Sequence, residues 1–392
     1  MKDVVILSAA RTPVGKFGGS LKSFTAPQLG ALAIGAAVKR AGLEPSDVQE
    51  CIMGIVLSAG VGQNPARQAA VKAGLPIEIG SLNVNKICGS GLKSVMLAAN
   101  SIRAGEHEVL VAGGMECMSM APYLLTEGRF GYRLGDNTIV DHLVRDGLWD
   151  SFSDSHMGNT AETVAERFNV TRQEADELSY QSHVKAAAAQ KAGKFDKEII
   201  PVKVKSKKEE IELRQDEGVR ADTSMEALAR LKPAFREGGI VTAGNASQLS
   251  DGAAAVIVTS REFAESRGLK PLASIVDYNT AGTRPEWIME APIPCTRALL
   301  QRNNLTIKDI DLFEHNEAFA TASVAVKREL QVPDDRFNVN GGAVALGHPI
   351  GCSGARVLTT LIHAMHDRGA NTGLATLCLG GGNAVSMIVK RE

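Results

Sequence analysis

The sequence predicts an α/β protein made of two similar halves, with a further domain inserted into the first half. Three observations indicate this organisation. Apolar segments of strand length alternate with amphipathic helices, an order typical of a sheet covered by helices. Short motifs from the first part of the chain return near its end in the same order. The stretch at 119–249 differs in character from both parts.

The first part of the chain alternates expected strands with expected helices. From Leu92 onward the apolar residues recur with the period of a helix, and Gly105 stands where such a helix stops. An earlier helix ends in the same way before Gly42. The expected elements are strands at 4–7, 52–57 and 109–112, helices at 29–41 and from Leu92, and, later in the chain, a strand at 310–313 and a helix at 319–330.

Three pairs of matching segments connect the two halves. They are 83–85 with 338–340, 43–48 with 305–310, and 254–262 with 384–392. The first pair is Asn-Val-Asn, followed each time by a glycine-rich turn and an amphipathic helix, the second of which stops at Gly369. Because the three pairs keep their order, duplication explains them better than chance. We therefore predict domains at 1–118 plus 250–268, at 119–249, and at 269–392.

The inserted domain has its own pattern. A helix should begin after Thr171, since Thr171 and Glu174 form the spacing of a capping box. The expected elements are a loop at 126–154, helices at 160–168 and 172–191, and a solvated strand or loop in the charged run at 203–212. This composition is typical of a lid that covers a substrate.

Composition limits the class of protein. Hydrophobic residues make up 44% and charged residues 22%, and the net charge is −1, which does not indicate nucleic acid or an anionic membrane as a partner. No apolar run has membrane-spanning length, and the first one is too short for a signal peptide. The six cysteines are widely separated and form no C-x-x-C pair. We expect free thiols in the cytoplasm and no metal site.

Four glycine-flanked polar residues follow predicted strands: Cys88, Asn316, His348 and Cys378. In α/β sheets, ligands bind where strands end, so these residues are candidates for one site. Cys88 stands just before a helix N-terminus, where unpaired N–H groups and the helix dipole favour a thiolate.

Each of these residues alone has a simpler explanation. Cys88 and Cys378 could be small core residues, Asn316 could cap the following helix, and Gly-His-Pro around His348 could be only a turn. Together they indicate nucleophilic catalysis. A thiolate nucleophile needs a base such as histidine, a second cysteine could act as acid or base on carbon, and the N–H groups at 380–382 could form an oxyanion hole.

The complete ordered set of motifs resembles the thiolase family, of the acetyl-CoA acetyltransferase type, over the whole chain. The motifs are SAARTP at 8–13, NKICGSG at 85–91, AGGME at 112–116, TAGNAS at 242–247, NEAF at 316–319, GHP at 347–349 and CLGGG at 378–382. The resemblance implies duplicated α/β halves that form a layered α-β-α-β-α core, with an inserted loop domain.

The resemblance also implies a reaction and its residues. Two acetyl-CoA would interconvert with acetoacetyl-CoA and CoA in a ping-pong mechanism. Cys88 would carry the acyl group, His348 would activate Cys88, and Cys378 would move the α-proton. The enolate oxygen would be held by His348 and a water on Asn316, and the acyl oxygen by the N–H groups of Cys88 and Gly380.

Coenzyme A contacts are implied mainly in the insertion. Arg220 would lie at the adenine or phosphate end and Ser247 at the pantetheine, although Arg220 could be an ordinary surface arginine and His156 an ordinary buried histidine. The remaining implied contacts are Leu148, His156, Met157, Ser224, Phe235, Ala243 and Phe319. CoA thioesters would be substrates, no cofactor is implied, and family members are dimers or tetramers.

Chain-length preference stays open at this point, because residues 285–292 differ from the short-chain biosynthetic forms of the family. The first alternative is a degradative 3-ketoacyl-CoA thiolase of fatty-acid β-oxidation that accepts longer chains. A more distant alternative is a non-catalytic CoA-binding scaffold, against which the four polar residues argue. The presence of Cys378 disfavours a condensing enzyme that depends on a carrier protein.

Overall fold

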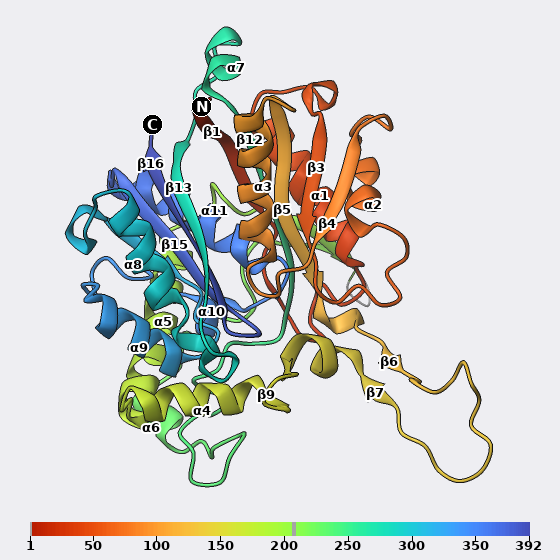
Figure 1. The fold of residues 1–392 in the computed structure, drawn as a ribbon, viewed down its shortest axis with the longest axis vertical. Helices are drawn as coiled ribbons and strands as arrows, with labels where there is room; N and C mark the ends of the chain where they lie inside the picture. The colour runs from red at the N-terminus through yellow and green to blue at the C-terminus, as the bar shows by residue number, and fades with distance from the viewer. Residues whose placement is uncertain (1, 206–208) are drawn as a thin grey trace.

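Two halves of similar topology form the body of the protein (Figure 1). The computed structural model describes residues 2–205 and 209–392. In the first half the strands lie in the order β1, β12, β5, β3, β4, and in the second half in the order β13, β16, β15, β14. These strands are β1 (Val4–Arg11), β3 (Glu50–Gly54), β4 (Gly80–Val84), β5 (Val109–Cys117), β12 (Ser250–Ser260), β13 (Ala273–Gly282), β14 (Leu312–His315), β15 (Thr372–Leu379) and β16 (Asn383–Arg391).

The sequence repeat has a counterpart in strand pairing. β12 and β16 each lie between two antiparallel neighbours, β1 and β5 in one half and β13 and β15 in the other. β3 pairs with β5, and β14 with β15, in parallel. The matched segments near 45 and 307 both form a 3₁₀ turn, η1 (Pro45–Asp47) and η5 (Ile307–Asp309), each with its aspartate accepting from the capping backbone N–H. The halves join where β1 pairs with β13.

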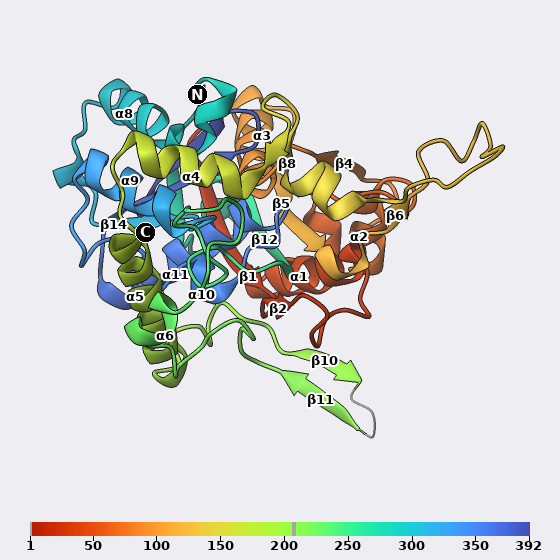
Figure 2. The ribbon, with the colours of Figure 1, turned by 90° about the horizontal axis from the view of Figure 1, so that it is seen from below.

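Helices fill three layers around these strands, giving an α-β-α-β-α core (Figures 1 and 2). α3 and α11 pack together between the halves, and the predicted apolar stripe of each is buried in one shared core cluster. α1 and α2 cover the outer face of the first half, and α8 and α9 that of the second. Their bounds are α1 (Ala26–Arg40), α2 (Pro65–Lys72), α3 (Ser90–Ala104), α8 (Pro292–Arg302), α9 (Ala320–Leu330) and α11 (Ser353–Arg368).

The inserted segment between β5 and β12 contains helices and short hairpins. α5 has the predicted bounds and capping box at Thr171, whereas α4 begins earlier than predicted because His156 caps it. The charged run forms β10 and β11, apart from residues 206–208, which lie outside the described part. The elements are η2 (Met118–Met120), β6 (Tyr123–Leu124), β7 (Val140–Asp141), the π-helix η3 (Leu143–Leu148), β8 (Trp149–Asp150), β9 (Ser155–His156), α4 (Met157–Arg167), α5 (Arg172–Lys191), β10 (Val202–Lys205), β11 (Glu210–Leu213) and α6 (Met225–Ala229).

Two arms project from the body, the β6–β7 hairpin and the β10–β11 hairpin (Figure 2). The remaining short elements are β2 (Gly15–Lys16), α7 (Arg261–Ser266), η4 (Pro285–Glu290) and α10 (Ala343–Leu346). Among the described residues, no helix is both long and apolar enough to cross a membrane.

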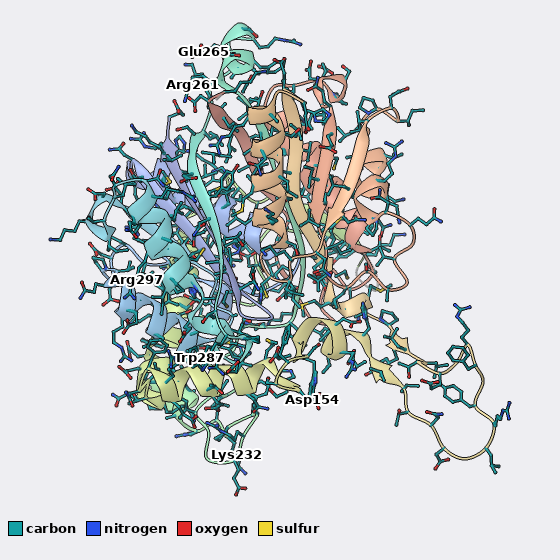
Figure 3. The ribbon with its side chains drawn as sticks, in the orientation of Figure 1. Asp154, Lys232, Arg261, Glu265, Trp287 and Arg297 are labelled. Carbon is teal, nitrogen blue, oxygen red and sulfur yellow. The ribbon has the colours of Figure 1, made fainter. Side chains whose placement is uncertain are left out.

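The two ends of the chain lie close together (Figure 1). Arg261 on α7, labelled in Figure 3, connects them, since its guanidinium donates to Asp3 and to Glu392 at 2.5 Å each.

Strand β5 continues five residues beyond the predicted end at Ala112, through the Gly113-Gly114 pair. Both glycines allow close approach of other chain segments. A Cβ on Gly113 would lie 2.2 Å from the Ala254 carbonyl oxygen of β12, and one on Gly114 would lie 2.1 Å from the Gly351 carbonyl oxygen. The pair therefore serves packing and does not mark a turn.

We predict that Gly114→Ala destabilises the protein by about 1–3 kcal/mol, since the methyl group would displace the backbone of Gly351. Denaturant unfolding at 25 °C measures this change. Gly35→Ala is the matched control, because a Cβ there is 3.9 Å from its nearest neighbour and should stabilise helix α1 by about 0.5–1 kcal/mol. Equal stability of Gly114→Ala and the wild type would contradict the proposed close packing.

Candidate active site

A cavity of about 350 Å³ lies between the inserted segment and the ends of strands from the second half. Cys88, His348, Cys378 and Gly380 all line it, although they come from distant parts of the chain. Seven of the predicted coenzyme A contacts line it as well: Leu148, His156, Met157, Phe235, Ala243, Ser247 and Phe319.

A tight turn between β4 and α3 positions Cys88. The Asn85 side chain accepts from the Ile87 N–H, and Ile87 has a positive φ of 47°. The Ser90 hydroxyl accepts from the backbone N–H of Lys86 and donates to the Ile87 carbonyl at 2.6 Å. Cys88 thus stands immediately before α3, as the sequence predicted, with its sulfur in the cavity.

His348 lies beside this cysteine. Its Nε2 is 3.3 Å from Cys88 Sγ, and its Nδ1 is 2.5 Å from Ser353 Oγ. The Ser353 hydroxyl donates to the Pro349 carbonyl at 2.9 Å, so it accepts a hydrogen bond from Nδ1–H. This arrangement fixes the tautomer and leaves the Nε2 lone pair facing the thiol. Asn316 Nδ2 lies 3.4 Å from the same Nε2, and among described residues the buried Asn316 Oδ1 has no hydrogen-bond partner.

Burial keeps the side chains of Cys88, Cys378 and His348 in their neutral forms before a substrate binds. Desolvation raises the pKa of the Cys88 thiol well above its usual range, and the nearby Cys378 raises it further. Burial also raises the pKa of Cys378 to about 12. The pKa of His348 falls to about 3 through burial and the nearby Arg356 guanidinium. Desolvation therefore outweighs the effect of the helix N-terminus, which was expected to favour the thiolate form of Cys88.

Backbone N–H groups face the Cys88 sulfur. Those of Cys88 itself and of Gly380 act to lower the pKa of this thiol, which is the effect of hydrogen bonds to a negative sulfur. Gly380 follows β15, whose penultimate residue Cys378 pairs with Ala384 and is 3% exposed. The turn that follows needs positive φ at Gly381 and Gly382.

Glu116 holds the His348 loop in place, a function that the sequence did not reveal. Its buried carboxylate accepts from the backbone N–H groups of Val56, Leu57 and Gly351, the last at 2.8 Å. Burial raises the pKa of this carboxyl group to about 7. The AGGME motif contains Glu116, but its partners are visible only in the folded chain.

Two predicted contacts do not line the cavity. Arg220 is an exposed residue whose backbone N–H donates to His183 Nδ1, and Ser224 caps helix α6 by accepting from Ala227. One of the simpler explanations is also wrong. Asn316 does not cap α9, whose N-cap is Phe319. His156 is only partly buried and stacks on Phe235, with ring centroids 4.8 Å apart.

Several apolar residues complete the cavity without having been predicted. They are Ile87, Met118, Ile288, Met289, Ala318, Ile350 and Leu379. Ile288 and Met289 belong to the segment at 285–292, which differs from the short-chain biosynthetic forms of the resembled family, and this difference was the signal that could have indicated them. Ile87, Ala318 and Leu379 belong to the NKICGSG, NEAF and CLGGG motifs. Met118 and Ile350 have no local pattern that distinguishes them from core residues.

Comparisons with known proteins show which family the chain resembles over its full length. Residues 4–262 match the family model for the thiolase N-terminal domain, and residues 269–391 that for the thiolase C-terminal domain. The chain is 53% identical to an acetyl-CoA acetyltransferase of Cupriavidus necator over 393 residues, covering all of both chains. It is 51% identical to an acetyl-CoA acetyltransferase of Escherichia coli K12, again over both full lengths. The crystal structure of the Bacillus anthracis acetyl-CoA acetyltransferase superposes with a TM-score of 0.98 at 43% identity, covering 100% of this chain and 99% of that one.

We predict that alkylation of Cys88 by iodoacetamide accelerates by roughly tenfold per pH unit between about pH 6 and about pH 9. The raised pKa of the thiol means that the reactive thiolate is a small fraction throughout this range. Peptide mass spectrometry would follow Cys88 separately from Cys378. A plateau in the rate near neutral pH would indicate a resting thiolate–imidazolium pair and contradict the neutral pair.

Proposed function

The chain belongs to the thiolase family, and on this basis we propose that it is an acetyl-CoA acetyltransferase, an acyltransferase that converts two acetyl-CoA reversibly into acetoacetyl-CoA and CoA. The observation that carries this proposal is the 3.3 Å approach of His348 Nε2 to Cys88 Sγ in a cavity that Cys378 also lines. CoA thioesters are the substrates, and no resident cofactor takes part.

In the first half-reaction, Cys88 attacks the thioester carbonyl of acetyl-CoA while its proton moves to His348 Nε2. The N–H groups of Cys88 and Gly380 stabilise the oxyanion, a contribution of about 2.7–4 kcal/mol for one such donor. The C–S bond to CoA then breaks, and CoA leaves with the proton of Cys378. The products are acyl-Cys88, CoA, and a thiolate on Cys378 next to a protonated His348.

In the second half-reaction, the Cys378 thiolate removes the α-proton of another acetyl-CoA. Protonated His348 donates Nε2–H to the enolate oxygen, and a water held by the Asn316 amide would do the same. The enolate carbon attacks the acyl carbonyl, the C–S bond to Cys88 breaks, and Cys88 recovers its proton from His348. Both cysteines and the histidine return to their neutral forms.

The exposure of the lining residues supports a direction for the substrate. Ala243 is exposed and Ser247 is partly exposed, whereas Cys378 is buried. The long polar CoA moiety would therefore extend outward past Ser247, with Arg220 and Ser224 proposed as contacts for its nucleotide end. This arrangement favours an enzyme over a CoA-binding scaffold, because the reactive groups occupy the closed end.

The proposal includes a cytoplasmic enzyme of fatty-acid metabolism that forms a dimer or tetramer. Free thiols at all six cysteines, every one of them within the described residues, support a reducing compartment. The arm between β6 and β7 supports self-association, since it exposes large apolar side chains that monomers rarely present together. These are Tyr123, Leu125, Phe130, Tyr132, Leu134 and Ile139.

We predict that radiolabelled acetyl-CoA acylates the wild type and Cys378→Ala but not Cys88→Ala. Cys378→Ala should lose condensation by roughly 10²–10⁴-fold, because only the α-proton transfer requires its thiol, whereas CoA can leave as a thiolate. Trichloroacetic acid precipitation measures the acyl-enzyme, and acetoacetyl-CoA formation measures condensation. Cys51→Ala, in a separate core cluster, is the control with normal activity. Labelled Cys88→Ala enzyme would refute the assignment.

We predict that Phe130→Asp combined with Leu134→Asp lowers the molar mass measured by light scattering after size exclusion, with each active site intact. These side chains are 82% and 100% exposed, and burying two carboxylates in an interface is costly. Ile211→Asp on the β10–β11 arm is the control and should not change the mass. A wild-type monomer would contradict self-association.

A further inference from the structure

We propose that Trp287 sets the acyl chain-length limit as a positioning residue, because its ring fastens η4, one wall of the cavity, to helix α4. This inference rests on the proposed function and goes beyond it, since it names the contacts that restrict the acyl group.

The wall itself consists of Ile288 and Met289. Both line the cavity and are only 1% and 2% exposed. They belong to the same apolar cluster as Cys378 and Phe319. We place the CoA moiety at Ala243, because this lining residue is exposed whereas Ile288 and Met289 are buried. An acyl chain that extends beyond the reacting carbons therefore meets Ile288 and Met289.

The backbone of η4 holds this wall weakly. Within η4 (Pro285–Glu290), Trp287 departs from helical geometry, with φ −107° and ψ 27°. Such a short 3₁₀ segment has few internal hydrogen bonds, so its position depends on side-chain contacts. The Trp287 N–H donates to the Arg284 carbonyl, and the Ala291 N–H to that of Ile288.

Two arginines lie against the Trp287 ring. Arg167 Cζ is 3.8 Å and Arg284 Cζ is 5.0 Å from the ring centroid, within the range of cation–π attraction. Two carboxylates orient these arginines. Glu290 accepts from Arg167 Nε at 2.5 Å, and Glu286 accepts from Arg284 Nε at 2.7 Å. Figure 3 shows Trp287 beside α4.

The contacts of Arg167 with Trp287 and Glu290 join two walls of one cavity. Arg167 is the last residue of α4, and Met157, the first residue of that helix, lines the cavity. α4 has eleven residues and is about 16 Å long, so a contact at its far end anchors η4 without touching the substrate. Without the ring, η4 would lose its stacking contact with Arg167 and keep only the Arg167–Glu290 ion pair at this end of α4, so that Met289 could move outward.

The test compares kcat/KM for thiolysis of 3-ketooctanoyl-CoA and of acetoacetyl-CoA. In Trp287→Ala, the ratio of the first to the second should rise by roughly tenfold or more, the discrimination typical of one or a few methylenes. Trp287→Phe keeps an aromatic face and should restore the wild-type ratio. Arg297→Ala, which removes an exposed arginine and its ion pair with Glu329 on α8 and α9, should leave the ratio unchanged.

Arg167→Met is the second variant, because it removes the cation at an exposed position and does not depend on loss of a large ring. It should raise the same ratio. An unchanged ratio in either folded variant, or an equal loss on both substrates, would overturn the positioning role. Acylation of wild-type Cys88 by acetyl-CoA is measured first. If Cys88 is acylated and the ratio stays constant, only this inference fails, whereas an unacylated wild type refutes the proposed function itself.

Discussion

The desolvation of Cys88, His348 and Cys378 by the surrounding protein is the constraint on which the rest of the site depends. Burial raises the pKa values of both thiols and lowers that of the imidazole, so all three are neutral at rest. Charge separation then becomes favourable only when a substrate supplies a carbonyl oxygen. The N–H groups of Cys88 and Gly380 can donate hydrogen bonds to this oxygen. The same low-polarity surroundings strengthen those hydrogen bonds once the charge forms.

The fold produces this desolvation by bringing three separate parts of the chain together. The first half contributes Cys88 at the start of α3, and the second contributes His348 and the β15 end with Cys378. The inserted segment closes the cavity from outside. Glycine makes this packing possible, since side chains at Gly114 and Gly351 would force the loops around His348 and Glu116 apart.

Sequence reasoning predicted what depends on local chemistry. The capping box at Thr171 determined α5, and glycines in left-handed conformation ended α3 and α11 where expected. Cys88, Asn316 and Cys378 could be assembled because strand ends meet at one edge of an α/β sheet. His348 was wrongly expected to follow a strand, since it lies in the loop between α10 and α11.

Properties that depend on contacts with residues distant in sequence could not be predicted from local sequence patterns. The protonation state of Cys88 was predicted from its helix terminus alone, but desolvation by residues distant in sequence decides it. Gly113 and Gly114 looked like the end of a strand because nothing local reveals the carbonyl groups that approach them. The partners of Glu116 and of Ser353 likewise exist only after folding.

The ion pairs of Arg261 with Asp3 and Glu392 have a consequence for engineering the chain. Since Arg261 contacts both Asp3 and Glu392, the two ends of the chain lie close together, and a short linker could connect them with little loss of conformational entropy. New ends opened at the tip of the β6–β7 arm would then leave the core strands and the cavity continuous. The architecture is thus suited to circular permutation.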